Sequence, residues 1–195
     1  MRGKSYYVYD GEMAPGGVGS GTMTFPNGDK YVGPWENFLP DGAEGTMTFS
    51  DGSTYTGGWT AHERNTQAAG TKKEKLKRGK GNLGPRGPAR MTYSNGDVFK
   101  GEWVDGHRKD GPGTMVYQRG ATYDGEWQSN RRHGQGKETQ PDGHVYSGSW
   151  VSGLYDGTGT MVYPNGEVFL QGQWEKGGRA AGEGTYEYLD GTAFT

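Results

Sequence analysis

Short apolar runs and turn dipeptides alternate along most of the chain, and together they predict strands joined in hairpins. A run such as Thr22-Met23-Thr24-Phe25 alternates polar and apolar residues, which is the period of a strand with one buried face. A turn dipeptide follows, here Asn27-Gly28, and then an aromatic-x-Gly-x-Trp segment, here Tyr31 to Trp35. Each unit therefore indicates strand, turn and strand.

The hairpin unit recurs at a nearly constant spacing. The six tryptophans are separated by 24, 44, 24, 23 and 24 residues, and a fixed period of this size indicates an array of supersecondary units. We expect an all-β fold, an elongated single-layer antiparallel meander of repeated β-hairpins, as one array over residues 1–195. Its expected parts are a half repeat at 5–18, hairpins at 19–35, 43–59, 89–103, 111–127, 134–150 and 157–174, and a truncated repeat at 182–195.

Loop length decides which residues share a face of each hairpin. A two-residue turn at Asn27-Gly28 would place Met23 on the face opposite Tyr31 and Trp35, which would split the apolar set. A three-residue loop that starts at Pro26, with Gly28 in the left-handed conformation, instead pairs Met23 with Tyr31. The same rule predicts the pairs Gly21 with Gly33, Gly19 with Trp35, Met115 with Tyr123, Gly113 with Gly125, and Gly111 with Trp127. The glycines would leave room for an indole or for a ring of the neighbouring unit.

Composition shows what must hold such a sheet together. Of 195 residues, 39 are glycine and only 30% are hydrophobic, so a thick two-layer core is excluded, while 13% are aromatic. Aromatic rows must therefore stack across one face. We expect these rings to be core and, in part, a surface for binding partners: Tyr31, Trp35, Tyr55, Trp59, Trp103, Tyr123, Trp127, Tyr146, Trp150 and Trp174.

The repeated unit resembles a known family. The stretch from Tyr123-Asp124-Gly125-Glu126-Trp127 to Arg132-His133-Gly134-Gln135-Gly136 is similar to the MORN (membrane occupation and recognition nexus) repeat. The resemblance covers almost everything outside residues 60–88, with departures at residues 41–45, at Ala89 and near Leu170. It implies successive hairpins side by side in one twisted sheet, and Tyr55 to Arg64 resembles a repeat of the radial spoke heads of cilia.

One segment interrupts the repeat. Residues 60–88 form a basic insertion with eight positive and two negative side chains, a charge of 8 − 2 = +6, against −8 for the rest of the chain. Three interpretations stay open: a solvated loop, an arm that docks on an acidic protein surface such as tubulin, or a contact with anionic lipid or nucleic acid. The residues that define its basic part are Lys72, Lys73, Lys75, Lys77, Arg78 and Lys80.

The residues favour no catalytic chemistry. The chain presents the same groups many times over, whereas catalysis needs a few unlike groups brought together. It has no cysteine, and its four histidines are scattered; we place His107 and His133 in loops between hairpins. We therefore expect no enzymatic activity, no cofactor and no metal site.

The resemblance implies a non-enzymatic scaffold that mediates protein–protein interactions in a cytoskeletal assembly. Short proteins built almost entirely of these repeats include subunits of ciliary and flagellar axonemes, so we expect a soluble cytoplasmic protein of the axoneme, with radial spoke or doublet-associated partners. The alternatives are a phospholipid-associated adaptor at a membrane and a regulatory module of an enzyme. The net charge of −2 argues against nucleic acid as a partner of the whole chain.

The C-terminal segment predicts an unpaired sheet edge. Tyr186, Tyr188 and Phe194 open a repeat that lacks its Trp, and an incomplete strand leaves backbone groups unpaired. We expect this edge to pair with a partner protein or with a second copy of the chain, giving a homodimer.

The insertion should be dispensable for folding. Replacing residues 60–88 with a short Gly-Ser linker should leave cooperative thermal unfolding in place, since long loops cost little closure entropy. Circular dichroism melts of the two proteins make the comparison, and a loss of the cooperative transition would show that the segment is structural.

Overall fold

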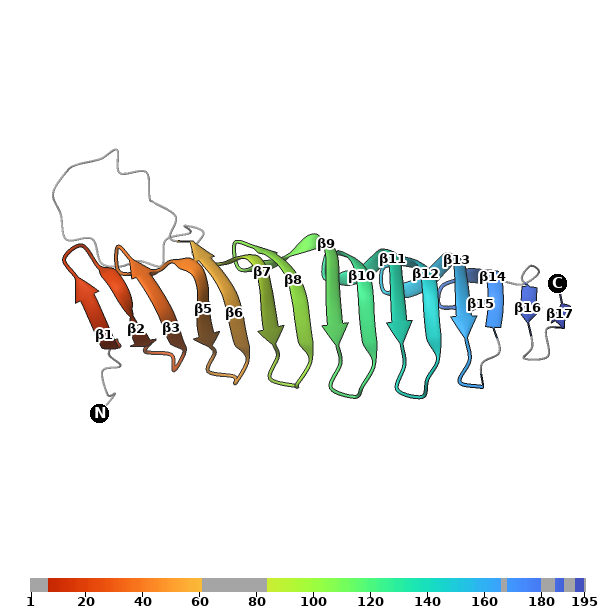
Figure 1. The fold of residues 1–195 in the computed structure, drawn as a ribbon, viewed down its shortest axis with the longest axis horizontal. Coiled ribbons are helices and arrows are strands. Elements are labelled where there is room, and N and C mark those ends of the chain that lie inside the picture. The colour runs from red at the N-terminus through yellow and green to blue at the C-terminus, as the bar shows by residue number, and fades with distance from the viewer. Residues whose placement is uncertain (1–6, 61–83, 166–167, 180–184, 188–191, 195) are drawn as a thin grey trace, which may run out of the picture. The chain divides into compact units, whose positions relative to one another are not determined.

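The computed structural model describes residues 7–60, 84–165, 168–179, 185–187 and 192–194. Its contacts divide the chain into two compact units, Met1–Met91 with Trp103–His107, and Thr92–Glu102 with Arg108–Thr195. Every regular element in the described ranges is a strand, and paired strands run antiparallel. Within each unit the strands follow one another in chain order (Figure 1). The predicted all-β class and the meander of repeated hairpins are confirmed.

The first unit contains the N-terminal hairpins. Its strands are β1 (Val8–Ala14), β2 (Val18–Thr24), β3 (Lys30–Glu36), β4 (Leu39–Pro40), β5 (Gly42–Thr48), β6 (Thr54–Thr60) and most of β7 (Gly84–Thr92). The next strand, β8 (Val98–Val104), has residues in both units.

The second unit continues the same arrangement. Its strands are β9 (His107–Val116), β10 (Thr122–Gln128), β11 (Arg131–Thr139), β12 (Val145–Val151), β13 (Leu154–Val162), β14 (Val168–Glu175), β15 (Gly178–Arg179), β16 (Thr185–Glu187) and β17 (Ala193–Phe194). At the C-terminal end, β16 pairs with β14 on one side and with β17 on the other.

The three-residue loop and its register are confirmed. Met23 pairs with Tyr31, Gly21 with Gly33 and Gly19 with Trp35. The second hairpin tested repeats this pattern, with Met115 opposite Tyr123, Gly113 opposite Gly125 and Gly111 opposite Trp127. Gly28 has a φ of 91°, the left-handed conformation that the loop requires.

The segments between hairpins are strands, which corrects the placement of His107 and His133 in loops. His107 begins β9, and His133 lies inside β11. Two-residue turns close these strand pairs, and both central residues have positive φ, as at Ser129 (50°) and Asn130 (65°). That conformation is the type I′ turn, whose twist matches that of paired strands. The turn at Ser129-Asn130 was hard to recognise from the sequence, because serine is not a usual residue at the first central position of a type I′ turn.

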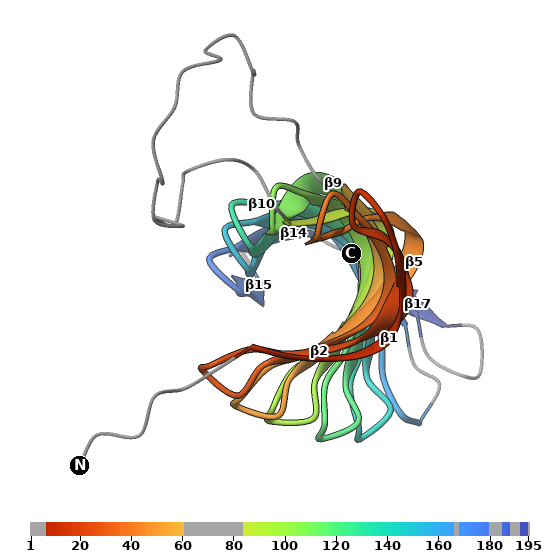
Figure 2. The ribbon, with the colours of Figure 1, turned by 90° about the vertical axis from the view of Figure 1, so that its left-hand side faces the viewer.

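A register shift bends the strands between the two turns. In the β10–β11 pair, Gly125 lies opposite Gly136 but the next residue, Glu126, lies opposite His133, so extra residues bulge from β11. Bulges increase local twist and bend a strand. In the first unit, the strands coloured red to orange curve around a concave side (Figure 2).

Edge-to-face aromatic contacts form the core of each unit. Each tyrosine ring lies between the tryptophan of its own hairpin and that of the next, as Tyr123 does at centroid distances of 5.2 Å from Trp127 and 5.1 Å from Trp150. Tyr31 repeats this with Trp35 and Trp59 at 4.9 and 5.1 Å. We call this series the aromatic ladder. Such pairs add about 0.5–1.5 kcal/mol each beyond the burial of area.

Paired glycines make room for the tyrosine rings of the ladder. A Cβ added at Gly125 would lie 2.6 Å from the Tyr123 hydroxyl oxygen and 2.5 Å from Cα of Gly136 on the next strand. The same ring covers Gly136. The space left by the glycines is thus filled by the tyrosine two residues earlier, which also reaches the following repeat, and not by the indole.

The register predicts opposite outcomes for two neighbouring substitutions. Trp127 is 5% exposed, whereas Glu126 lies on the other face and is exposed. Trp127→Ala should reduce the free energy of unfolding by about 3–5 kcal/mol, and Glu126→Ala should change it by less than about 0.5 kcal/mol. Urea titrations of both variants provide the measurement, and equal small effects would contradict the ladder as the source of stability.

Candidate functional site

The rings expected to bind partners are the core of the two units. Their exposed fractions run from 0% at Tyr31, Tyr55 and Tyr123 to 8% at Trp59. The other members are equally buried: Trp35, Trp103, Trp127, Tyr146, Trp150 and Trp174. Burial leaves little of each ring for a second molecule to touch, and a role in partner binding stays a prediction.

Hydrogen bonds to the backbone hold the tyrosine hydroxyl groups and five indole nitrogens of the ladder. The Tyr123 hydroxyl donates to the carbonyl of Glu126 at 2.9 Å, and the Tyr146 hydroxyl donates to that of Ser149 at 3.0 Å. The indole of Trp127 donates to the carbonyl of Gly113 at 2.9 Å. The same indole bond recurs at Trp35, Trp59, Trp150 and Trp174. These groups are therefore already used in holding the ladder together.

A second layer of the same face is only half-buried. Each hairpin contributes one residue just before its turn, two positions after the methionine or, in one hairpin, after Glu138. These residues are Phe25, Phe49, Tyr93, Tyr117, Gln140 and Tyr163. These residues share the face of Met115 and Tyr123 by strand parity. We call them the half-buried layer. The sequence analysis did not single them out, although the parity argument applied to Phe25 and Tyr117 would have found them.

A third set of side chains lies opposite the tryptophans. Arg132 and Tyr155 pair across the strands with Trp127 and Trp150, and each follows its tryptophan by five residues. The guanidinium of Arg132 lies 4.3 Å from the centre of the Trp150 ring, and Arg108 lies 4.7 Å from both Phe99 and Trp127. Cation–π contacts of this kind contribute about 0.5–2 kcal/mol. Sequence reasoning missed this position; its signal is the fixed spacing from Trp.

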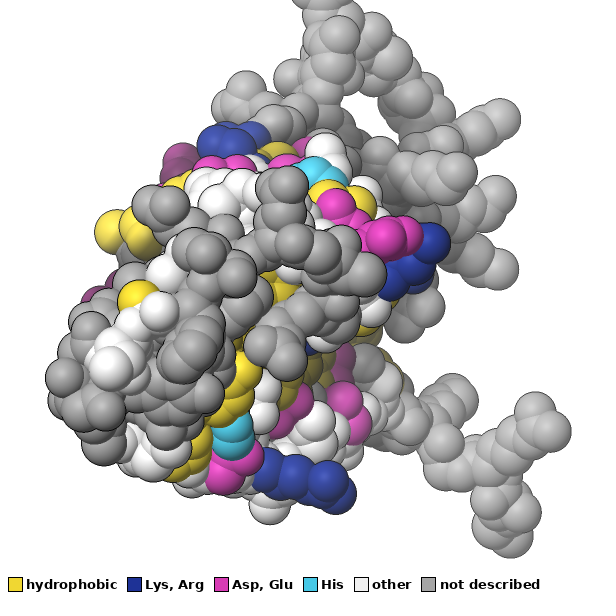
Figure 3. Space-filling model, turned by 90° about the vertical axis from the view of Figure 1, so that its right-hand side faces the viewer, with side chains coloured by type: hydrophobic (Ala, Val, Ile, Leu, Met, Phe, Trp, Pro, Cys, Tyr) yellow, Lys and Arg dark blue, Asp and Glu magenta, His cyan; other side chains and the backbone are white. Residues whose placement is uncertain are grey.

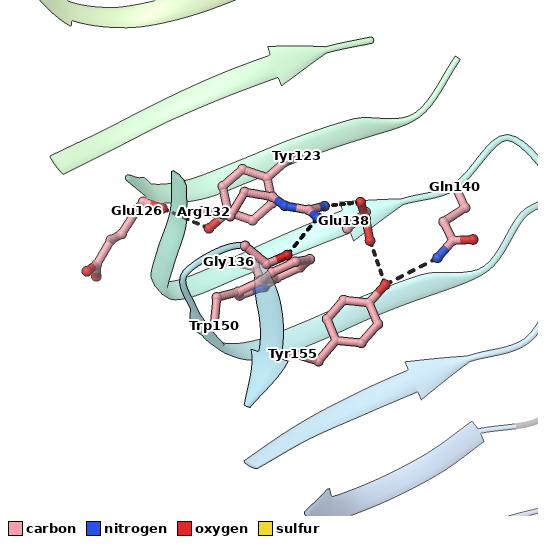
Figure 4. A network of polar contacts seen from close by, with 9 residues as sticks. Tyr123, Glu126, Arg132, Gly136, Glu138, Gln140, Trp150 and Tyr155 are labelled. Carbon is pink, nitrogen blue, oxygen red and sulfur yellow. Dashed lines mark hydrogen bonds and ion pairs between the residues drawn. The ribbon is translucent and has the colours of Figure 1, made fainter. Parts of the chain in front are cut away.

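The second unit carries a polar cluster on its aromatic face (Figure 4). Glu138 forms an ion pair with Arg132 and accepts a hydrogen bond of 2.5 Å from the Tyr155 hydroxyl. Gln140 donates to the same hydroxyl at 3.2 Å, and Arg132 also donates to the carbonyl of Gly153 at 2.8 Å. Four polar side chains therefore bond to one another on the aromatic face of the second unit.

Glu138 occupies the position that methionine holds elsewhere. It pairs with Tyr123 on one side and Tyr146 on the other, as Met115 and Met161 pair with the same two tyrosines. Glu138 is 9% exposed. A charge so buried is tolerated only when it is paired and hydrogen-bonded. Burial, and then the bond to Glu138, raises the pKa of Tyr155 well above its usual value.

The remaining predicted residues fall at the margins of the described structure. The basic residues Lys72 to Lys80 and Tyr188 lie outside the described residues. For Tyr186 and Phe194 the backbone pairing is described, one opposite the other in β16 and β17. Their role as a docking edge, and the homodimer, stay predictions.

A shallow cavity lies in the first unit beside one tryptophan. Its volume is about 440 Å³, and it is lined by Trp59, Asp41 and Arg86 among others. The two opposite charges flank an indole that is 8% exposed. The residues that line this cavity do not recur in every hairpin, because Gly58 stands where other hairpins carry Pro34 or Glu126.

Other kinds of site find no support in the parts of the chain that the structure covers. Those parts contain no group of three or more side chains that could hold a metal ion. They also contain no helix long and apolar enough to cross a membrane. On the surface seen in Figure 3, acidic and basic side chains lie next to one another and do not form a patch of one sign.

The chain belongs to the MORN repeat family. The family model matches residues 18–30, 44–54, 99–122, 123–145, 146–168 and 171–193. These segments cover more than half of the chain and contain the strand-turn-strand units described above. The search of curated proteins gave no significant match.

A solved structure shares the fold at low sequence identity, and further solved structures are similar at lower TM-scores. The TCP domain of Drosophila melanogaster SAS-4 (dCPAP), in complex with a proline-rich motif of Ana2 (dSTIL), is 12% identical with a TM-score of 0.52, over 95% of this chain and 87% of that one. The TCP10 domain of Danio rerio CPAP is 18% identical with a TM-score of 0.43, over 90% and 71%. At such identities the likeness shows the fold alone.

The buried tyrosines predict a loss of stability at high pH. Burial raises the pKa of Tyr123 and Tyr146 from 10.0 to about 12, so the folded state holds these protons more tightly than the unfolded chain does. The resulting stability is complete below pH of about 10 and is lost as the pH rises to about 12, up to roughly 2–3 kcal/mol per tyrosine. Urea titrations across this window measure the loss.

Tyr123→Phe provides the control, because Phe99 fills the same repeat position. This variant should lose less stability over the window than the parent chain. Identical pH profiles for the two proteins would show that Tyr123 does not carry the effect.

Proposed function

We propose that the protein is a non-enzymatic scaffold that binds extended segments of partner proteins in a cytoskeletal assembly. The observation that carries this proposal is the half-buried layer, above all Tyr93, Tyr117 and Tyr163. It places amphipathic rings along one face of a sheet whose fully buried rings are already used as core. Tyrosines in this state offer apolar area and a hydroxyl group at low entropic cost.

Variation between hairpins supports a role in recognition. The ladder repeats with little change, whereas the half-buried layer and the position opposite Trp vary, for example from Tyr117 to Gln140 and from Arg132 to Tyr155. Binding to different residues of an extended partner needs such variation. The fold likeness agrees with it, because the SAS-4 domain holds a proline-rich motif of another protein.

The cellular location of this assembly is a second part of the proposal. We infer the axoneme of cilia or flagella, with radial spoke or doublet-associated partners, from the resemblance of this repeat array to short axonemal proteins of the family. The solved structures are domains of SAS-4 and CPAP, which are other proteins, and a role in centriole elongation is suggested for one of these domains.

Site-specific crosslinking in ciliated cells tests both the scaffold function and the axonemal location. A photo-crosslinking amino acid replaces Tyr117, on the aromatic face, and in a matched variant it replaces Val116, which is 42% exposed on the opposite face. Both variants keep the ladder intact. We expect the probe at 117 to capture proteins that stay with detergent-extracted axonemes, and the probe at 116 to capture far less.

Two outcomes would contradict the proposal. Equal capture at 116 and 117 would show that the aromatic face is not the binding surface. Recovery of the chain only with membrane vesicles would favour the phospholipid-associated alternative over the scaffold.

A further inference from the structure

Arg108 and Arg132 hold equivalent places in successive hairpins. Each follows a tryptophan by five residues and stacks on the rings of the ladder. Each also donates from Nη2 to a carbonyl in the next two-residue turn: Arg108 to Asn130 at 3.1 Å, and Arg132 to Gly153 at 2.8 Å. Those carbonyls belong to residues three positions after Trp127 and Trp150. The Nη2 contacts of the two guanidinium groups are therefore equivalent, and Arg108 also donates from Nε to the side-chain oxygen of Asn130 at 2.9 Å.

The two arginines differ at Nη1. In Arg132 this nitrogen is paired with the carboxylate of Glu138. In Arg108 it is buried and has no hydrogen-bond partner among the described residues. The residue that corresponds to Glu138 is Met115, which is 6% exposed and cannot accept a strong hydrogen bond. One repeat thus contains a complete arginine–carboxylate pair, whereas in the preceding repeat no carboxylate among the described residues pairs with Nη1 of the arginine.

An unpaired guanidinium nitrogen is costly where water cannot reach it. A buried donor without a partner loses the full desolvation free energy of that group, and more so if it is charged. A carboxylate is the acceptor whose geometry and charge match a guanidinium, and the bond gains strength from both charges. Glu138 shows that a carboxylate fits beside this arginine position in this very fold.

The surroundings of Arg108 suit an extended peptide. Burial raises the pKa of two members of the half-buried layer, Tyr93 and Tyr117, and the charge of Arg108 lowers both pKa values against that larger effect. The rings of Phe99 and Trp127 lie on the guanidinium itself. A carboxylate flanked by flat, apolar residues would meet aromatic surface on either side.

We propose that Arg108 is the docking point for a carboxylate of a partner, an Asp or Glu side chain within an extended segment that lies on the half-buried layer. This inference rests on the proposed function and names the chemistry of the partner. Nη1 is covered by protein in the structure, so docking displaces a covering side chain. Met115, unbranched and at the position of Glu138, is the one we expect to move.

The first test supplies the carboxylate from within the chain. Met115→Glu copies the arrangement of Glu138 beside Arg132, so the variant should keep a melting temperature near that of the parent chain. The matched control is Met47→Glu: Met47 is 9% exposed, and its hairpin has Pro40 opposite the tryptophan, with no arginine there. This control should melt at a clearly lower temperature. The double variant Arg108→Gln/Met115→Glu should melt at a clearly lower temperature than Met115→Glu alone, because the new carboxylate then has no arginine to pair with.

The second test uses a defined probe and the full chain. Fluorescence anisotropy compares a labelled Pro-Pro-Glu-Pro-Pro peptide with its Pro-Pro-Gln-Pro-Pro counterpart at low salt. We expect the Glu peptide to bind at least about tenfold more tightly. Arg108→Gln and Met115→Glu should each abolish this preference, the second because its own carboxylate fills the site. Lys109→Gln, which removes the same charge from an exposed neighbour, should preserve it.

The outcomes separate this inference from the proposed function. Equal binding of both peptides, or equal destabilisation by Met115→Glu and Met47→Glu, overturns the role of Arg108 while the crosslinking result at 117 still supports the scaffold. No binding of either peptide also overturns it. The scaffold itself fails if the probe at 117 captures no axonemal protein in preference to the probe at 116, or if the chain is recovered only with membrane vesicles.

Discussion

The close approach of glycine pairs beneath a tyrosine ring is the constraint on which this fold depends. A single-layer sheet has no second layer to cover its apolar face, so the rings must lie flat on the backbone itself. Side chains at Gly125 or Gly136 would occupy the space of the Tyr123 ring. Once the ring is seated, its hydroxyl reaches the carbonyl of Glu126 and its edges meet two tryptophans. Glycine content and aromatic content are therefore two parts of one requirement.

This constraint separates structural residues from those free to carry specificity. The tyrosines and tryptophans of the ladder are buried and bonded to the backbone, so changing any of them damages two hairpins at once. The methionine row, the half-buried layer and the position opposite Trp face fewer demands. There the chain departs from its own pattern, with Glu138 for methionine, Gln140 for an aromatic residue, and Tyr155 for arginine. These departures occur together and form one hydrogen-bonded cluster.

The sequence predicted the hairpins and their register because both follow from local parity and from turn geometry. Met23 opposite Tyr31 needs only the loop length and the demand that apolar residues share a face. The contacts of Arg132 and Tyr155 were not predictable in that way. Arg132 lies beyond a second turn at Ser129-Asn130, and Tyr155 lies beyond one at Ser152-Gly153. A two-residue turn reverses the parity, and a bulge of two extra residues then shifts which residue lies opposite each tryptophan. Which polar side chains meet on the aromatic face depends on those shifts.

The two arginines show how a repeat protein can build a site without new architecture. Two successive hairpins hold a guanidinium group in the same surroundings, stacked on aromatic rings and bonded to the carbonyl of a turn. We call each of these positions an arginine seat. In the Arg132 seat, Glu138 compensates the buried charge, and Tyr155 and Gln140 complete the bonding. Around Arg108, Met115 offers no carboxylate, and Nη1 has no hydrogen-bond partner among the described residues. Since an unpaired buried donor costs stability that a pair restores, one substitution in the methionine row decides whether the arginine serves the fold or an incoming carboxylate.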